Sequence, residues 1–518
     1  METERQSPGG PDAGAGGRVR RDAAAEMSPD EFRRAGHRVV DLIADWLGRM
    51  PAGPVTRAAT PRAVRAVIGE RPLPQEGTPP LPALEQAARL LFEHSLFNGH
   101  PRFWGYITSS AAPLGALADL LAAAVNPNVG GWQLSPLASE IEAQSIRWLG
   151  ELIGFPTGGG ILVSGGNMAN LVAFFAARRA KAPWDLRTEG LAGRTERLVF
   201  YASTESHTWV QKAADLSGLG TAAIRWIDVD DRQRVQVAAL EERVRDDRRA
   251  GLLPFLVVGA AGTVGTGAID PLPEIAAVAR RENLWFHVDG AYGAPAAALD
   301  DAPAELRGLA AADSIALDPH KWLYAPLEAG CTLVRESRRL VDAFSFHPAY
   351  YRFGDADDED PQTNYYEMGP QNSRGFRALK VWLGLQQAGR DGQVRMIRDD
   401  IELARALSRA VAARDDLEAV TCNLSISTFR YVPADLRGRD EARTYLDALN
   451  EELLDRLKEG GEAFLSNAVV DGRFVLRACI VNFRTTRADV EALPPLVARL
   501  GREADARLRP ASLQPAPD

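Results

Sequence analysis

The sequence has 518 residues, which allows two to four domains at about 150 residues each and a large buried core. Apolar residues make up 46% and charged residues 25%, as in globular proteins and unlike disordered, fibrous or membrane chains. Lys and Arg number 60 and Asp and Glu 69, so the formal net charge is −9. This balance gives no overall basic surface for nucleic acid or anionic lipid, and it favours a small metabolite as the partner.

The cysteines and the apolar runs indicate a soluble protein of a reducing compartment. The three cysteines form no CxxC pair and no cluster with histidine, which argues against a disulfide framework and a structural zinc site. The sequence begins without a signal-peptide pattern, since Gly and Pro follow its first charged residues. The most apolar stretch, residues 114–125, contains Asp119 and is too short to span a bilayer. We therefore expect a cytoplasmic location.

The first hundred residues predict a tail, a helix and an extended segment. Residues 1–25 are rich in Gly with little to bury, so we expect a disordered tail. Ser28 followed by Pro29 and Glu31 is a helix-start signature, and apolar residues at helical spacing follow it. Residues 51–82 are Pro-rich and aperiodic, which predicts an extended segment. We group residues 26–105 as an N-terminal helical segment.

The middle of the chain, residues 106–392, alternates short apolar runs with longer helical patterns. This rhythm predicts an α/β fold with a mostly parallel sheet. The expected strands are residues 160–163, 197–201, 255–258, 284–288 and 314–317, and the expected helices include residues 168–181 and 273–282.

Residues 393–500 predict a smaller C-terminal α/β domain. Helical patterns cover residues 375–387 and 394–412, and strand-like runs follow at residues 425–431 and 474–481. We expect residues 501–518, which contain several Pro and Ala, to be frayed.

Ligands of α/β sheets bind beyond the carboxyl ends of the strands, so polar residues that follow strands are informative. The first such group is Ser164–Gly165–Gly166–Asn167, which joins a predicted strand to a predicted helix. Its glycines would let backbone N–H groups approach a phosphate at the positive end of the helix. A tight turn that needs glycine for its geometry alone is an equally good interpretation.

The second group is Asp289, which closes a run of mostly large apolar residues. A buried carboxylate needs a cationic or hydrogen-bonding partner, and a protonated heterocyclic nitrogen would serve. A cap on the following turn is the alternative. His207 could lie flat against a ring, although a single histidine is more often structural.

The third group is Asp318–Pro319–His320–Lys321–Trp322, in which a lysine follows a strand among apolar and aromatic neighbours. Most lysines are solvated, but a desolvated lysine is a nucleophile for carbonyl groups, and the adjacent His320 could handle protons. A phosphate cradle, a buried Asp and a desolvated Lys together suit pyridoxal phosphate, which has a phosphate, a pyridine nitrogen and an aldehyde.

Over roughly residues 26–490 the sequence resembles the pyridoxal-phosphate-dependent group II decarboxylases. The resemblance is carried by segments in matching order and spacing: residues 31–36, 100–106, 135–142, 289–292, 319–322 and 374–380. It implies the PLP-dependent transferase fold of type I, with a seven-stranded sheet, and a homodimer with shared active sites. The N-terminal segment would then pack on the partner subunit.

The resemblance also implies a role for each matching residue. Lys321 would form the Schiff base with the cofactor, Asp289 would pair with its pyridine nitrogen, and His207 would stack on its ring. The remaining cofactor contacts would come from Gly165, Gly166, Asn167, Thr263, Ala291 and His320. A loop tyrosine would act in the partner's site, which counting back from Arg374 places at Tyr365, with Tyr366, Tyr350 and Tyr351 as weaker candidates.

Several positions depart from the pattern of this family. Asp318 stands where the family usually has Asn, and its carboxylate would repel a nearby phosphate unless it turns away or is protonated. Val264 replaces a Thr, and positions that are aromatic in the animal aromatic decarboxylases are here Asn98, Ile107 and Gly130. The remaining aromatic surface comes from Trp104, Tyr106 and Trp132, and we expect Trp104, Tyr106 and Ile107 to contact the substrate.

The leading hypothesis is a decarboxylase of L-amino acids with an aromatic or otherwise bulky side chain. An aldehyde synthase that uses the same cofactor is the nearest alternative, and Tyr365 favours decarboxylation because the related synthases typically have Phe there. A decarboxylase of glutamate, aspartate or diaminobutyrate is a further alternative. A non-catalytic binding protein is disfavoured by the presence of Lys321, Asp289, His207 and Tyr365. The acidic run of residues 355–360 is interpreted as a solvated part of the loop.

Overall fold

The computed structural model describes residues 23–346 and 362–514 of the chain. The predictions for most of the N-terminal tail, for Tyr350 and Tyr351, and for the acidic run 355–360 lie outside these residues. Contacts between residues divide the chain into two units: residues up to 49 together with 59–95, and residues 50–58 together with 96–518. Each unit is described by itself.

The first unit consists of three helices, α1 (Pro29–Arg49), α2 (Pro61–Ile68) and α3 (Pro80–His94). The predicted start of α1 is confirmed, because the Glu31 N–H donates to Oγ of Ser28 at 3.2 Å and the Ser28 N–H donates back to Oε2 of Glu31 at 2.9 Å. The prediction of an extended segment over residues 51–82 is wrong at α2. Thr60 caps that helix by accepting a hydrogen bond from the Ala63 N–H at 3.2 Å, and Pro61 is its first residue.

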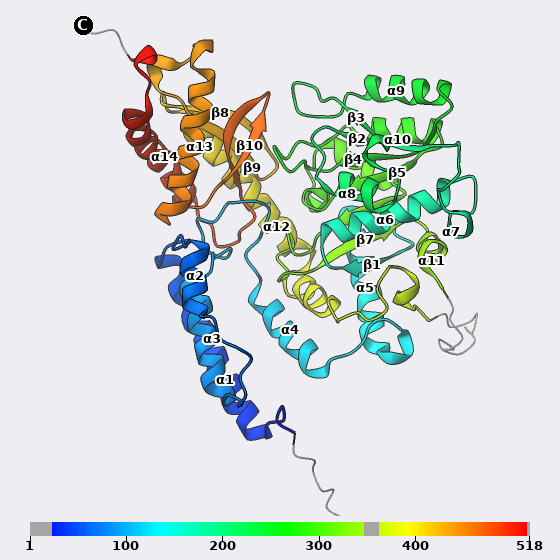
Figure 1. Ribbon diagram of the computed structural model, residues 1–518, viewed down its shortest axis with the longest axis horizontal. Helices are drawn as coiled ribbons and strands as arrows, with labels where there is room; N and C mark the ends of the chain where they lie inside the picture. The colour runs from blue at the N-terminus through cyan, green and yellow to red at the C-terminus, as the bar shows by residue number, and fades with distance from the viewer. Residues whose placement is uncertain (1–22, 347–361, 515–518) are drawn as a thin grey trace, which may run out of the picture. The chain divides into compact units, whose positions relative to one another are not determined.

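The second unit is built on a seven-stranded, mostly parallel sheet, as the sequence predicts (Figure 1). The spatial order is β1-β7-β6-β5-β4-β2-β3, and only β7 runs antiparallel to its two neighbours. The strands are β1 (Gly159–Val163), β2 (Leu198–Ser203), β3 (Ile224–Ile227), β4 (Leu253–Ala260), β5 (Trp285–Asp289), β6 (Ser314–Leu317) and β7 (Gly330–Val334).

Helices flank this sheet and bury its central strands (Figure 1). Every residue of β2, β6 and β7 is buried, which explains why these strands show apolar runs rather than alternation in the sequence. The helices are α4 (Pro113–Val125), α5 (Pro136–Ile153), α6 (Gly166–Lys181), α7 (Leu186–Glu189), α8 (Trp209–Leu216), α9 (Val237–Arg249), α10 (Leu272–Arg281), α11 (Arg338–Phe344) and α12 (Ala378–Ala412).

The C-terminal part of the same unit contains a four-stranded antiparallel sheet in the order β10-β11-β9-β8. Its strands are β8 (Leu417–Asn423), β9 (Ile426–Tyr431), β10 (Ser466–Val470) and β11 (Arg473–Cys479), and its helices are α13 (Arg443–Gly460) and α14 (Arg487–Leu508). Helix α12 leads into this part and is kinked at Gly389, where φ is +61°, so the two predicted helices meet at this residue.

Two expected boundaries differ from the structure. Helix α14 continues to Leu508, so the chain is helical where the sequence predicts a frayed end from residue 501. The N-terminal unit ends at residue 95 rather than 105, because Phe103 pairs with Phe464 next to the C-terminal sheet. None of the described helices is both long and apolar enough to cross a membrane.

The sheet topology brings the three predicted strand-end motifs to one edge. Strands β4, β5 and β6 are parallel, and β1 has the same direction as β6 because both run antiparallel to β7. The residues that follow β1, β4, β5 and β6 therefore emerge side by side, at the carboxyl ends where α/β sheets bind their ligands.

Candidate active site

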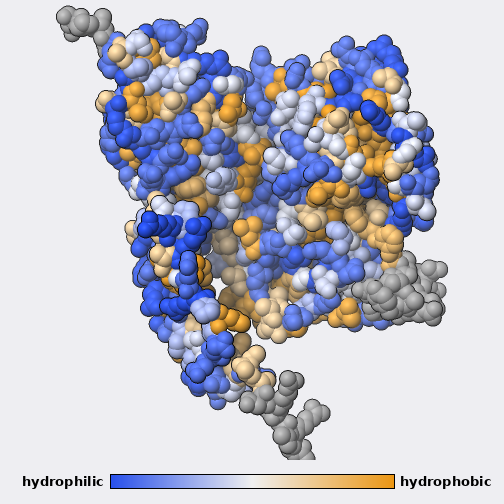
Figure 2. Space-filling model, viewed as in Figure 1, coloured by the Kyte–Doolittle hydropathy of each residue, from blue (hydrophilic) through white to orange (hydrophobic). Residues whose placement is uncertain are grey.

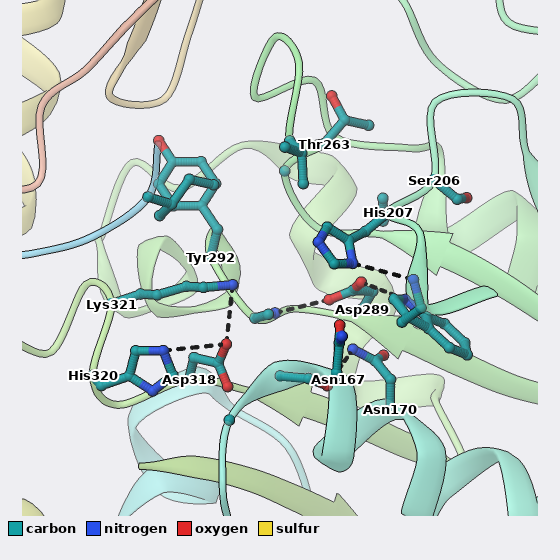
Figure 3. Close-up of a pocket in the computed structure, with 18 of the residues that line it drawn as sticks. Asn167, Asn170, Ser206, His207, Thr263, Asp289, Tyr292, Asp318, His320 and Lys321 are labelled. Carbon is teal, nitrogen blue, oxygen red and sulfur yellow. Dashed lines mark hydrogen bonds and ion pairs between the residues drawn. The ribbon is translucent and has the colours of Figure 1, made fainter. Parts of the chain in front are cut away.

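A cavity of about 460 Å³ lies at this edge and has the size of a small-molecule site. Figure 3 shows its polar side chains converging from separate loops of the chain. The predicted residues among those that line it are Ile107, Gly165, Gly166, Asn167, His207, Thr263, Asp289, Ala291, His320 and Lys321.

The glycine motif forms the wall of the cavity at the start of α6. Gly165 precedes the helix with φ of +109°, a value that side chains rarely adopt, and no side chain caps the first N–H groups. A Cβ atom at Gly166 would lie 2.5 Å from Oδ2 of Asp318, so this position excludes a larger residue. The helix start thus offers free N–H groups and positive potential to an anion in the cavity.

Asp289 is the last residue of β5 and is held by two donors. The indole Nε1 of Trp209 donates to Oδ2 at 2.8 Å, and the Ala291 N–H donates to Oδ1 at 3.2 Å. Trp209 is buried, which fixes the orientation of the carboxylate. The sequence analysis did not assign a role to Trp209, although its position two residues after His207 on the same turn was a usable signal.

His207 and Thr263 face the same space (Figure 3). Nδ1 of His207 accepts a hydrogen bond from the Trp209 N–H at 3.3 Å, which leaves Nε2 to carry the proton of a neutral ring. Partial burial lowers the pKa of His207, so the neutral ring is favoured at physiological pH. Thr263 is buried, and its hydroxyl is 3.1 Å from that of Thr266.

Lys321 lies opposite this group, in the turn that follows β6. Its Nζ is 3.0 Å from Oδ2 of Asp318, and its side chain is 21% exposed. Burial alone lowers the pKa of Lys321, but the Asp318 and Asp289 carboxylates outweigh it and raise the pKa above its usual value. His320 stands beside this pair, with its Nδ1 2.7 Å from the Ala329 carbonyl oxygen, and burial lowers the pKa of its imidazole.

Tyr365 does not reach this cavity in its own chain. It is 1% exposed and belongs to the main hydrophobic core. The Arg374 guanidinium lies 4.7 Å from the centre of its ring, and the same guanidinium is paired with the buried Glu142 carboxylate at 2.5 Å. The sequence motifs around Glu142 and Arg374 thus meet in a buried ion pair next to the ring of Tyr365.

Of the three predicted substrate contacts, the structure places one in the wall of this cavity. Ile107 lines the cavity, but Tyr106 does not, and it is 59% exposed with its ring near Phe464. Trp104 is 1% exposed in the core of the C-terminal part, where its Nε1 donates to Thr485 Oγ1 at 3.1 Å. The Trp104 backbone bonds to Phe464 and Cys479, and these bonds draw the residue away from the cavity.

The structure adds residues that sequence reasoning missed. Asn170, one turn into α6, accepts a hydrogen bond at 2.7 Å from the buried His287, which supports the cavity floor. Tyr292 lies near Lys321, and its hydroxyl is 2.6 Å from that of Ser425. The other cavity residues without an assigned role are Ser164, Glu205, Ser206, Val258, Ala260, Gly262, Val264, Leu327 and Glu328.

The arrangement fits pyridoxal phosphate. The N-terminus of α6 can receive the phosphate at a glycine whose Cβ would clash, the Asp289 carboxylate can receive a protonated ring nitrogen, and Lys321 supplies an amine. These three groups come from three different strand ends and line one cavity. Among the described residues, no group of three or more His, Cys, Asp or Glu side chains could hold a metal ion.

Comparison with known proteins agrees with this fit. The model of the pyridoxal-dependent decarboxylase conserved domain matches residues 68–432. The aromatic-L-amino-acid decarboxylase of Bacillus atrophaeus is 34% identical over 480 residues, which cover 92% of this chain and 97% of that protein. The phenylacetaldehyde synthase of Petunia hybrida is 29% identical over 467 residues, 88% of this chain and 91% of that protein.

A solved structure shows the same fold. The crystal structure of Oryza sativa TDC with PLP and tryptamine superposes with a TM-score of 0.85 at 30% identity, and the match covers 92% of this chain and 99% of that one. The chain therefore belongs to the pyridoxal-dependent decarboxylase family. It is a carboxy-lyase that uses pyridoxal phosphate, as the motifs at the strand ends predict.

Proposed function

We propose that the protein removes the α-carboxylate of an aromatic L-amino acid as CO2 and releases the amine. The observation that carries the proposal is the convergence of Lys321, Asp289 and the Gly165–Asn167 turn on one cavity. The aromatic preference is supported by the similarity to the Bacillus atrophaeus enzyme and by the apolar Ile107, Val264 and Leu327 in the cavity wall.

The cofactor and the residues that would hold it have separate roles in this reaction. Pyridoxal phosphate supplies an aldehyde that reacts with amines and a protonated ring that accepts the electron pair left by departing CO2. Asp289, oriented by Trp209, keeps a proton on the ring nitrogen. The N–H groups at Gly165–Asn167 would hold the phosphate, and the Lys321 amine would hold the aldehyde end of the cofactor.

The remaining cavity residues position the ring and move protons. His207, neutral and held by Trp209, would hold the cofactor ring together with Ala291 and Thr263, which line the same cavity. His320, adjacent to Lys321, accepts and returns protons during the exchange of amines.

An aldehyde synthase is the second candidate, because the petunia phenylacetaldehyde synthase matches nearly the whole chain. A decarboxylase of a cationic amino acid such as diaminobutyrate is the third. Two carboxylates, Glu205 and Glu328, line the cavity, and Glu205 has no ion-pair partner within 4 Å among the described residues. Burial raises the pKa of Glu205, as expected for a carboxylate without a nearby cation.

The enzyme works as a homodimer in this proposal. Helix α4 exposes Leu117, Leu120, Leu121 and Val125, each at least half accessible. Figure 2 shows hydrophobic residues exposed over the part of the unit where Figure 1 places α4. Single exposed apolar residues are common on protein surfaces, but these four lie together on one helix. In the proposed homodimer, a second copy of the chain covers them.

A cytoplasmic location completes the proposal. All three cysteines have free thiols, two of them buried, which suits a reducing compartment.

The test is a CO2-release screen of the purified enzyme over the standard amino acids, DOPA, 5-hydroxytryptophan and diaminobutyrate. We expect the fastest release from an aromatic substrate, with one amine formed per CO2. Aldehyde and hydrogen peroxide as products would favour the second candidate, and fastest release from diaminobutyrate the third. If none releases CO2, the proposal fails.

A second test locates the cofactor. Borohydride reduction of the loaded enzyme followed by peptide mapping should place pyridoxal phosphate on Lys321, and Lys321→Ala should take up no label. Label on another lysine would contradict the assignment.

A further inference from the structure

Asp318 is an ionisable residue of the cavity to which the decarboxylase chemistry gives no role. It is 1% exposed and is the first residue after β6. Its Oδ2 is 3.0 Å from Nζ of Lys321 and 3.8 Å from Nε2 of His320. Beyond these ion-pair contacts, neither oxygen accepts a hydrogen bond from the described residues. A buried carboxylate in this position depends on a nearby cation.

The local backbone fixes the pairing of Asp318 with Lys321. The Lys321 N–H donates to the Asp318 carbonyl oxygen at 2.9 Å, so one tight turn carries both side chains into the cavity. On its other side, the carboxylate fills the space where Gly166 has no Cβ. Asp318 therefore has little room to turn away from Lys321 (Figure 3).

The other groups that face Lys321 are weaker partners. His320 is on the same turn, and its pKa is lowered by burial, so it is mostly neutral. Asp289 contributes a second negative charge but is held by Trp209 and Ala291. Among the described residues, further titratable groups interact with Lys321, Asp318 or His320: His207 before α8, Cys331 on β7, Lys380 on α12 and Cys479 at the end of β11. Tyr292, after β5, lies near Lys321.

We propose that Asp318 is a positioning residue that holds the free amine of Lys321 as an ammonium ion at the floor of the cavity. The proposal rests on Lys321 being the cofactor lysine. An ammonium ion has no free electron pair, so it must release a proton to solvent before its nitrogen can attack an aldehyde carbon. The carbonyl oxygen then leaves as water. Asp318 thus sets the pH above which Lys321 can recapture the cofactor.

The proton affinity of Lys321 can be measured without activity. The full-length protein, freed of cofactor with hydroxylamine, is treated with trace acetic anhydride at a series of pH values, and acetylation of each lysine is read by peptide mass spectrometry. Only the neutral amine reacts, so the midpoint of the profile reports the lysine pKa. We expect the Lys321 midpoint to fall by at least one pH unit in Asp318→Asn, which makes acetylation at pH 8 about tenfold faster.

A second Lys–Asp pair, whose carboxylate is 41% exposed, provides the control. Nζ of Lys380 is 3.1 Å from Oδ2 of Asp119, and Lys380 is buried. Asp119→Asn should shift the Lys380 profile and leave that of Lys321 unchanged. If Asp318→Asn does not fold, as judged by circular dichroism, Asp318→Ser removes the same charge with a smaller side chain.

An unchanged Lys321 midpoint in the folded Asp318 variant overturns the proposal. An equal shift of Lys321 in Asp119→Asn does the same, because the effect would then not belong to Asp318. Failure of the proposed function can be told apart from failure of this proposal. In that case borohydride would label another lysine, while the acetylation profile of Lys321 would be unchanged.

Discussion

At the scale of single residues, the cavity depends on side chains that orient other side chains. Trp209 directs the Asp289 carboxylate through its indole N–H and the His207 ring through its backbone N–H. One buried residue therefore positions two of the groups that face the cofactor. From the sequence alone, Trp209 can be recognised only as an apolar residue close to His207.

Tyr365 gives a direct test of the predicted loop tyrosine. We expect Tyr365→Phe to keep most of the decarboxylase activity, within about threefold, because the ring is a core residue below Arg374 and does not line the cavity. The measurement is the ratio of amine to CO2 in the product. Formation of aldehyde and peroxide by this variant would restore the role that the sequence resemblance implies for Tyr365.

At the scale of elements, the turns after the strands are fixed by the helices behind them. The turn that carries Lys321 is anchored to α12, since both the Trp322 indole and the Tyr324 hydroxyl donate to the buried Asp400 carboxylate. The glycine turn after β1 is anchored by α6, whose start forms the anion-binding wall. Sheet, turn and helix therefore act together in placing the reactive groups.

The start of α6 predicts a loss of cofactor affinity in Gly166→Ala. The added Cβ would overlap Oδ2 of Asp318 at 2.5 Å and displace the phosphate-binding turn. We expect pyridoxal phosphate to bind about tenfold more weakly or worse, a loss of about 1.4 kcal/mol. Gly384→Ala is the control, because a Cβ at this helical position meets no atom within 4 Å. Equal affinity of the two variants in a fluorescence titration would refute this account.

The buried Asp400 of α12, which accepts hydrogen bonds from Trp322 and Tyr324, predicts that stability depends on pH. Burial raises the pKa of Asp400 to about 7 from its ordinary 3.8, so the folded protein binds the proton more tightly than the unfolded chain. The free energy of unfolding should therefore fall as pH rises from about 4 to about 7, by about 4 kcal/mol from this group.

Urea unfolding at several pH values measures this effect. Asp400→Asn should flatten the fall between these pH values, whereas Asp391→Asn, at an exposed position of the same helix, should keep it. Parallel pH profiles for Asp400→Asn and the wild type would show that Asp400 does not titrate in this range.

At the scale of the whole molecule, the α/β unit leaves one apolar face of α4 uncovered. Leu121 and Val125 are 58% and 76% exposed, although α4 packs against α12 through its other side. The proposed homodimer covers this face.

Charge on α4 should therefore break the dimer. We expect the double variant Leu117→Glu and Leu121→Glu to elute as a monomer in size-exclusion chromatography with light scattering, and to lose at least about tenfold in activity if the sites are shared. Leu216→Glu, at an exposed leucine of α8, is the control and should stay dimeric. A dimeric double variant would place the interface elsewhere.

The sequence by itself determined the chemistry of the site. The Gly165–Gly166 turn, Asp289 and Lys321 each lie at or just beyond the carboxyl end of a strand, and a parallel sheet brings such positions to one edge whatever the packing around them. Strands β1, β2, β4, β5 and β6 of the large sheet were also predictable, because buried apolar runs are local patterns, whereas β3 and β7 were not among the expected strands.

Only the tertiary structure decided which neighbours reach the cavity. Trp104 and Tyr365 are of residue types that often line pockets, yet both are buried in hydrophobic cores. Trp104 contacts Phe464, which is distant in the sequence, and Tyr365 contacts the nearby Arg374. Burial depends on which distant segments pack together, and no local pattern in the chain records that choice.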